Sequence, residues 1–193
     1  MGTVEATTPA PLTLGRLYTA WNDADGGVRR AALAAVATSW LAAIALSSSL
    51  SVRLSAGVVG SMLVAAAVVD VHERRLPNRL LLAGALTAMG GASLAGDRWI
   101  IAAAFVGGVV AGAAMLVVRL ARGVGMGDVK AAVVVGASAG SVAAVAAPLA
   151  IAVAAFVAAG YGLLTHRSRL PLGPSLWVGW VVALFGTSSG WWS

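Results

Sequence analysis

The sequence predicts an all-α membrane protein, a polytopic bundle of six to seven transmembrane helices with its N-terminus in the cytoplasm. Of its 193 residues, 60% are hydrophobic and only 10% are charged, and the mean hydropathy is +0.91. A soluble domain of this length needs a polar surface that this composition does not supply. The 24 glycines also favour closely packed membrane helices, because small residues let helix backbones approach one another.

The chain divides into a polar N-terminal tail, residues 1–30, and a membrane domain, residues 31–193. The tail does not have the charged start and short apolar core of a cleavable signal peptide. A helix needs about 20 apolar residues to cross the hydrocarbon layer. The segment 128–140 is too short to cross alone, so the predicted number of spans is six or seven. In chain order the predicted spans are 31–50, 54–72, 79–95, 99–118, 128–140, 142–164 and 174–189.

Basic residues between these spans predict the orientation. Cytoplasmic loops of membrane proteins carry an excess of Lys and Arg. With a cytoplasmic tail and seven crossings, only Arg53 and Arg98 of the thirteen basic residues fall outside. The other eleven fall on the cytoplasmic side: Arg16, Arg29, Arg30, Arg74, Arg75, Arg79, Arg119, Arg122, Lys130, Arg167 and Arg169. The same orientation places Asp70 and Asp128 together at the cytoplasmic face.

These two aspartates are the candidate catalytic residues. Asp70 closes one long apolar run and Asp128 opens another, whereas the other five acids lie in the tail or in short loops. An ionised carboxylate on a membrane helix costs about 2.5–3.5 kcal/mol even on the lenient insertion scale, so such residues are functional candidates by default. Two of them at one face suggest an aspartyl dyad.

Each aspartate lies in a short motif. After Asp70 a basic loop leads to Pro77, which stops any helical continuation, and Asn78 is expected to cap a helix starting at Arg79. The second motif runs from Gly123 to Lys130, with glycine at 123, 125 and 127. These glycines leave the backbone uncovered, so that an extended peptide can lie beside Asp128, which is itself expected to cap the next helix.

Two facing carboxyl groups suit peptide hydrolysis, since one can activate water while the other protonates the scissile carbonyl. Like charges about 4 Å apart repel by about 4 kcal/mol at an effective dielectric near 20, so the pair is expected to share one proton near neutral pH. Helix dipoles suggest that Asp70, near a helix C-terminus, carries this proton more often than Asp128, at a helix N-terminus.

The motifs resemble those of the type IV prepilin peptidases, membrane aspartyl proteases of the Gly-x-Gly-Asp class. In that family an Asp is followed seven residues later by Pro and then Asn or Asp, as at Asp70, Pro77 and Asn78. The family's Gly-x-Gly-Asp-x-Lys is matched by residues 125–130. The stretch 170–176, Leu-Pro-Leu-Gly-Pro-Ser-Leu, is similar to the one that opens the family's last helix. The resemblance spans about residues 54–190.

The resemblance implies a leader peptidase of the inner membrane that cuts prepilin-like or pseudopilin-like proteins at the cytoplasmic face, often after a Gly that precedes their hydrophobic helix. Asp70 and Asp128 are then the catalytic pair. Expected partners are the pilin substrates and the lipid bilayer, with no nucleic acid, metal or cofactor. The chain has no cysteine, so the zinc site and methyltransferase activity of larger members are not expected. Substrate contacts are expected from Gly125, Gly127, Pro77, Asn78 and Lys130.

Three alternatives stay open at this point. Presenilin-type proteases share Gly-x-Gly-Asp but place Tyr before their first Asp, where this chain has Val69. A proton-coupled transporter would use both acids as a relay, but such acids are expected near mid-membrane rather than at span ends. An inactive scaffold in a secretion complex would keep the same sequence pattern without cleavage. The oligomeric state and the particular pilin are not indicated by the sequence.

Overall fold

The computed structural model describes residues 21–46, 48–73, 76–121, 124–165 and 172–189. Within these ranges the chain forms helices and no strands, which confirms the predicted all-α class. In chain order the helices are α2 (Gly26–Ala45), α3 (Leu50–Glu73), α4 (Asn78–Leu94), α5 (Arg98–Leu120), α6 (Met126–Gly140), α7 (Ala146–Thr165) and α8 (Leu172–Ser188).

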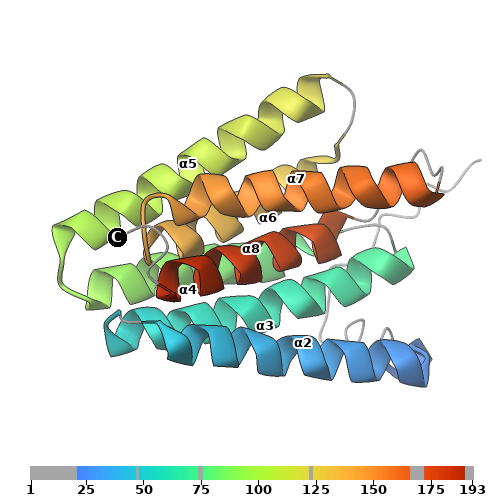
Figure 1. Cartoon of the computed structure of the whole chain (residues 1–193), viewed down its shortest axis with the longest axis horizontal. Coiled ribbons are helices and arrows are strands. Elements are labelled where there is room, and N and C mark those ends of the chain that lie inside the picture. Colours follow the sequence, from blue (N-terminus) through green and yellow to red (C-terminus); the bar gives the residue numbers. More distant parts are fainter. Residues whose placement is uncertain (1–20, 47, 74–75, 122–123, 166–171, 190–193) are drawn as a thin grey trace, which may run out of the picture.

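Successive helices run in alternating directions along the long axis of the molecule (Figure 1). Short connections hold neighbouring helices antiparallel, as in other helix bundles. The C-terminal ends of α3, α5 and α7 therefore lie at the same end as the N-terminal ends of α2, α4, α6 and α8. Asp70 and Asp128 both lie there, and we call it the aspartate end.

Helix α6 forms the centre of the bundle. It packs against α3, α4, α5, α7 and α8, and ten of its fifteen residues are buried. Its contact with α5 is so close that a Cβ added to Gly136 would collide with the backbone carbonyl oxygen of Gly107. A Cβ added to Gly107 would likewise collide with the carbonyl oxygen of Gly136. The short segment that could not cross a membrane alone is thus enclosed by longer helices.

The outer helices present large apolar side chains outward, which is typical of a surface that faces lipid. Among the described residues, four helices, α2, α3, α5 and α7, are long and apolar enough to cross a membrane. Helices α4 and α8 have 17 residues each and α6 has 15, so the total of six to seven spans stays a prediction. Exposed apolar side chains on α5 and α7 include Phe105, Val109, Val117, Phe156, Leu163 and Leu164.

The helix boundaries follow the predicted spans with local differences. Helix α2 begins at Gly26, five residues before the predicted start. Helices α6 and α7 are separate elements joined by residues 141–145, a boundary that the sequence left open. Between α4 and α5 the chain turns at Gly96, whose φ of 74° is one that glycine adopts without strain.

Candidate active site

Asp70 lies in the last turn of α3 and is held by the start of α8. Its side chain is buried, with 6% of the residue exposed, and its Oδ2 accepts a 3.1 Å hydrogen bond from the backbone N–H of Gly173. The first N–H groups of a helix have no partner within that helix, so this donor is free for the carboxyl group. A side chain at 173 would bring its Cβ within 3.1 Å of Ala67 Cα and 3.2 Å of Asp70 Oδ2, which explains the glycine.

Asp128 is the third residue of α6 and lies half-buried beside the glycine motif. Its Oδ2 accepts a 3.0 Å hydrogen bond from the N–H of Gly125. The predicted capping role was wrong, because α6 begins at Met126 and Gly125 holds the cap position. Asp128 reaches back from the first turn to that residue, as an acidic side chain at this position does in a capping box.

Asp70 and Asp128 are 58 positions apart in sequence, but α3 and α6 bring their carboxyl groups to the same end of the bundle. The two groups lie close enough for the charge of Asp70 to act on Asp128. Both accept an N–H at the start of a helix, Asp70 from α8 and Asp128 from α6. The C-terminus of α3 alone would favour the shared proton on Asp70. Because the N-terminus of α8 also faces Asp70, helix dipoles no longer distinguish the two residues.

The loop before α4 packs against the glycine motif and joins the two halves of the site. Pro77 is buried and holds the cap position of α4, so the predicted cap at Asn78 was wrong. The Asn78 side chain instead accepts a 3.0 Å hydrogen bond from Lys130 Nζ. A Cβ on Gly127 would lie 3.1 Å from Leu76 Cβ. Of the five predicted substrate-contact positions, 125 and 127 lie beside Asp128, 130 is joined to 78, and 77 lies between Leu76 and Asn78.

Sequence reasoning did not assign a role to Gly173. The similarity of residues 170–176 to the start of the family's last helix points to this position, but the contact of Gly173 with Asp70 spans 103 positions. Within the described part of the chain, no group of three or more His, Asp or Glu side chains could hold a metal ion. Residues 1–20, which include Arg16, lie outside the described residues, as do Arg74, Arg75, Arg122, Gly123 and residues 166–171.

Comparison with known proteins identifies the family. The family model of the type IV leader peptidases matches residues 57–163, a segment that covers more than half of the chain and contains both aspartates. No curated protein and no solved structure matches the sequence. Helices α2 and α8 lie outside the matched segment. The match agrees with the resemblance in the two aspartate motifs, and the chain belongs to the type IV leader peptidase family.

Proposed function

We propose that this protein is an aspartyl endopeptidase that removes leader peptides from prepilin-like proteins at the cytoplasmic face of the inner membrane. The observation that carries the proposal is the pair of carboxyl groups at one end of the bundle, each anchored by a backbone N–H, in a chain of the leader peptidase family. The basic residues support the cytoplasmic face, since Arg29, Arg30, Arg79, Arg119 and Lys130 belong to the aspartate end.

In the proposed reaction a water molecule lies between Asp70 and Asp128. The ionised carboxylate takes a proton as the water oxygen attacks the scissile carbonyl, and the protonated carboxyl donates its proton to the carbonyl oxygen. The tetrahedral intermediate then breaks its C–N bond as the leaving amine receives the proton that water gave up, and one hydroxyl group of the intermediate returns its proton to the aspartate that had protonated the carbonyl oxygen. Mutual repulsion of the two charges keeps one proton on the pair, so that an acid and a base are present together.

The glycine motif supports the binding of an extended peptide. Gly125 and Gly127 present backbone without side chains next to Asp128, and Leu76 packs against Gly127. Lys130 and Asn78 are exposed and are joined to each other, so they form a polar rim for the part of the substrate that lies in water. Acids at the end of the bundle suit cleavage next to the membrane surface better than a proton relay through its middle.

The test is co-expression with a tagged prepilin from the same genome, with leader removal followed by mass spectrometry. Wild-type protein is expected to cleave at one site ahead of the hydrophobic helix. Asp70→Asn and Asp128→Asn are each expected to abolish cleavage at equal protein levels, because neither amide can act as acid or base. Cleavage that survives either substitution would contradict the two-aspartate mechanism. Absence of cleavage by the wild type would favour the scaffold alternative.

A further inference from the structure

An apolar cavity of about 210 Å³ lies between α2, α3 and α8. Its walls include Ala31 and Ala35 from α2, Ala67 and Val71 from α3, and Pro174 and Trp177 from α8. The family match begins only at residue 57, so α2 supplies one wall from outside the matched segment. None of these residues belongs to the aspartate pair or to the glycine motif.

The cavity lies next to the candidate active site, because Ala67 and Pro174 in its walls adjoin Asp70 and Gly173. Ala67 lies one helical turn before Asp70 on the same side of α3, and the Cβ of a side chain at 173 would meet both Ala67 and the Asp70 carboxyl group. Pro174 directly follows Gly173, whose N–H holds Asp70. A peptide bond placed at the two aspartates would therefore have this cavity beside it.

The cavity extends from Asp70 toward the middle of the bundle. Its α3 wall reaches back to Val64, six residues before Asp70, which corresponds to about 9 Å along a helix axis. Because α3 is one of the candidate membrane spans, this direction leads into the apolar layer. The part of a substrate that remains in the membrane lies on this side of the scissile bond.

The walls are held in place by packing at the inner end. There Gly57 of α3 contacts the ring of Trp40, and Gly60 contacts Ser39, so α2 and α3 meet closely. Trp177 of α8 donates a 2.9 Å hydrogen bond from Nε1 to Ser39 Oγ. Toward the aspartate end the small side chains of α2 leave space, so the cavity exists without rearrangement of these helices.

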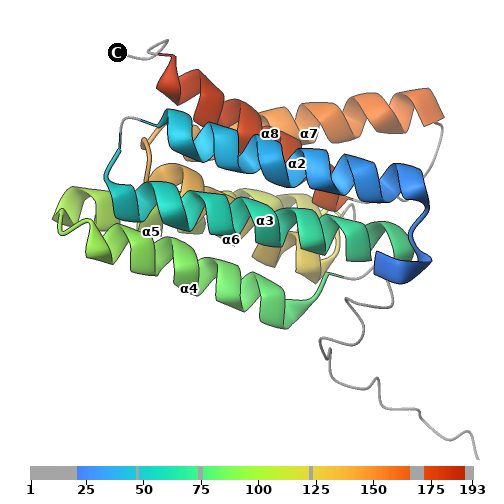
Figure 2. The same cartoon turned by 90° about the horizontal axis from the view of Figure 1, so that it is seen from below.

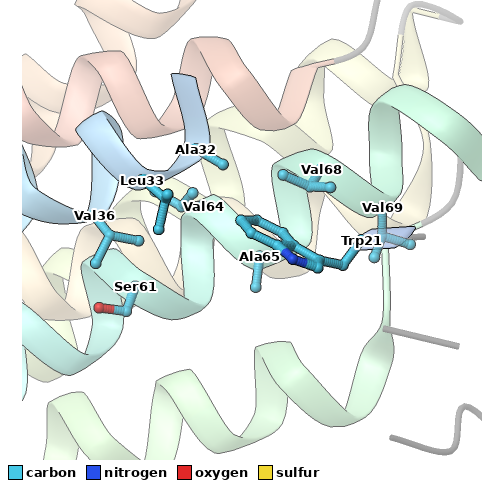
Figure 3. A pocket seen from close by; sticks show the side chains of 9 residues that line it. All are labelled: Trp21, Ala32, Leu33, Val36, Ser61, Val64, Ala65, Val68 and Val69. Carbon is cyan, nitrogen blue, oxygen red and sulfur yellow. The ribbon is translucent and has the colours of Figure 1, made fainter. Parts of the chain in front are cut away.

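A second cavity shows that the boundary between α2 and α3 accepts a large apolar side chain. This cavity, about 200 Å³ in volume, shares Ala32, Val64 and Val68 with the first. Trp21 forms part of its wall, and its indole ring extends along α3 beside Ala65 and Val68 (Figure 3). The first cavity offers α2 and α3 surfaces of the same apolar kind.

We propose that the cavity between α2, α3 and α8 binds the first apolar side chains on the C-terminal side of the scissile bond. This inference rests on the proposed function. Apolar walls exclude the charged part of a leader, because burying an unpaired charge is unfavourable, whereas a Leu or Phe side chain is stabilised there by burial. The cavity would thus set the register of cleavage, with the polar leader over the glycine motif and the apolar segment against α2.

The test fills the cavity from α2 and compares two substrates. One prepilin carries Leu at the first two positions after the cut and the other carries Ala. Wild-type protein is expected to prefer the Leu substrate by about tenfold or more in kcat/KM, in line with known hydrophobic pockets. Ala35→Leu should remove this preference, mainly by raising KM for the Leu substrate. Ala34→Leu, on the same helix but outside both cavities, should retain it.

An unchanged preference in Ala35→Leu would overturn the proposal. So would an equal loss for both substrates, which is the result expected if the cavity holds lipid. Photocrosslinking gives a readout independent of cleavage, with benzoylphenylalanine in place of Ala31 in the Asp128→Asn background. Crosslinks to the apolar segment are expected, and crosslinks confined to lipid or leader would contradict the assignment. Failure of wild-type cleavage would instead refute the proposed function itself.

Discussion

At the residue scale, Gly173 connects the last helix to the chemistry. It is buried, its N–H reaches Asp70, and its Cα lies against Ala67 of α3. No other residue type fits without movement, since an added Cβ would lie 3.1 Å from Ala67 Cα and 3.2 Å from the carboxyl oxygen. The position therefore requires close backbone approach rather than an unusual φ.

Gly173→Ala is expected to lower kcat by about 10- to 100-fold while KM changes little. The methyl group would displace the Asp70 carboxyl by a few tenths of an ångström and lengthen its hydrogen bond, and small misplacements of reacting groups have effects of this order. Steady-state cleavage of a prepilin by purified protein measures both constants. Gly160→Ala in α7 is the control, because nothing lies within 4 Å of its added Cβ. Wild-type kcat in Gly173→Ala would refute the positioning role.

At the element scale, the contact between α5 and α6 places the central helix. Gly107 and Gly136 face each other so closely that each would direct a Cβ onto the carbonyl of the other. Gly140 makes a similar approach, with its Cβ 2.5 Å from the carbonyl oxygen of Ala103. Since α6 carries Asp128 in its first turn, this packing fixes the position of Asp128 along the helix axis and the direction in which its side chain points.

Gly136→Ala is expected to destabilise the protein by about 1–3 kcal/mol, the usual cost of overpacking a tight core. The added methyl group would push α5 away from α6, and neither backbone can move without disturbing other contacts. Thermal unfolding in detergent measures the effect as a lower midpoint. Gly90→Ala in α4 has open space around its added Cβ and should be neutral or stabilising by up to about 1 kcal/mol. Equal midpoints for both variants would show that the contact is not tight.

Much of this architecture was predictable because membrane helices are long apolar runs interrupted by polar residues. The order of the helices and the meeting of Asp70 and Asp128 at one end follow from that pattern. The ends of the helices were harder to predict. Asn78 and Asp128 are residue types that often cap helices, but Pro77 and Gly125 hold the cap positions of α4 and α6. Which side chain occupies a cap depends on the approach of other helices, here Lys130 toward Asn78.

The contacts of α2 and α8 could not be predicted for a related reason. Asp70 and Gly173 are separated by 103 positions, and Ser39 and Trp177 by 138. Such pairings depend on how helices pack in three dimensions, which no local periodicity records. The cavity beside Asp70 likewise depends on the packing of α8 against the consecutive helices α2 and α3, and Figure 2 shows the ribbons of α2 and α8 side by side.

At the scale of the whole molecule, the two ends of the bundle differ in charge. Arg29, Arg30, Arg79, Arg119 and Lys130 belong to the aspartate end, and among the described residues only Arg53 and Arg98 belong to the opposite end. Excess basic charge is retained in the cytoplasm during insertion. The distribution therefore predicts that the site opens to the cytoplasm, where a leader peptide would be accessible before export of the rest of the protein.

Single cysteines test this orientation directly, because the natural chain contains none. Ser93→Cys, exposed near the end of α4, and Ala121→Cys, exposed at the end of α5, mark opposite ends of the bundle. A membrane-impermeant maleimide applied to spheroplasts is expected to label Cys at 93 and to reach position 121 only after lysis. The cysteine-free parent reports background labelling. Labelling in the reverse pattern would place the aspartates outside the cell and exclude cytoplasmic cleavage, since both carboxyl groups belong to the same end as position 121.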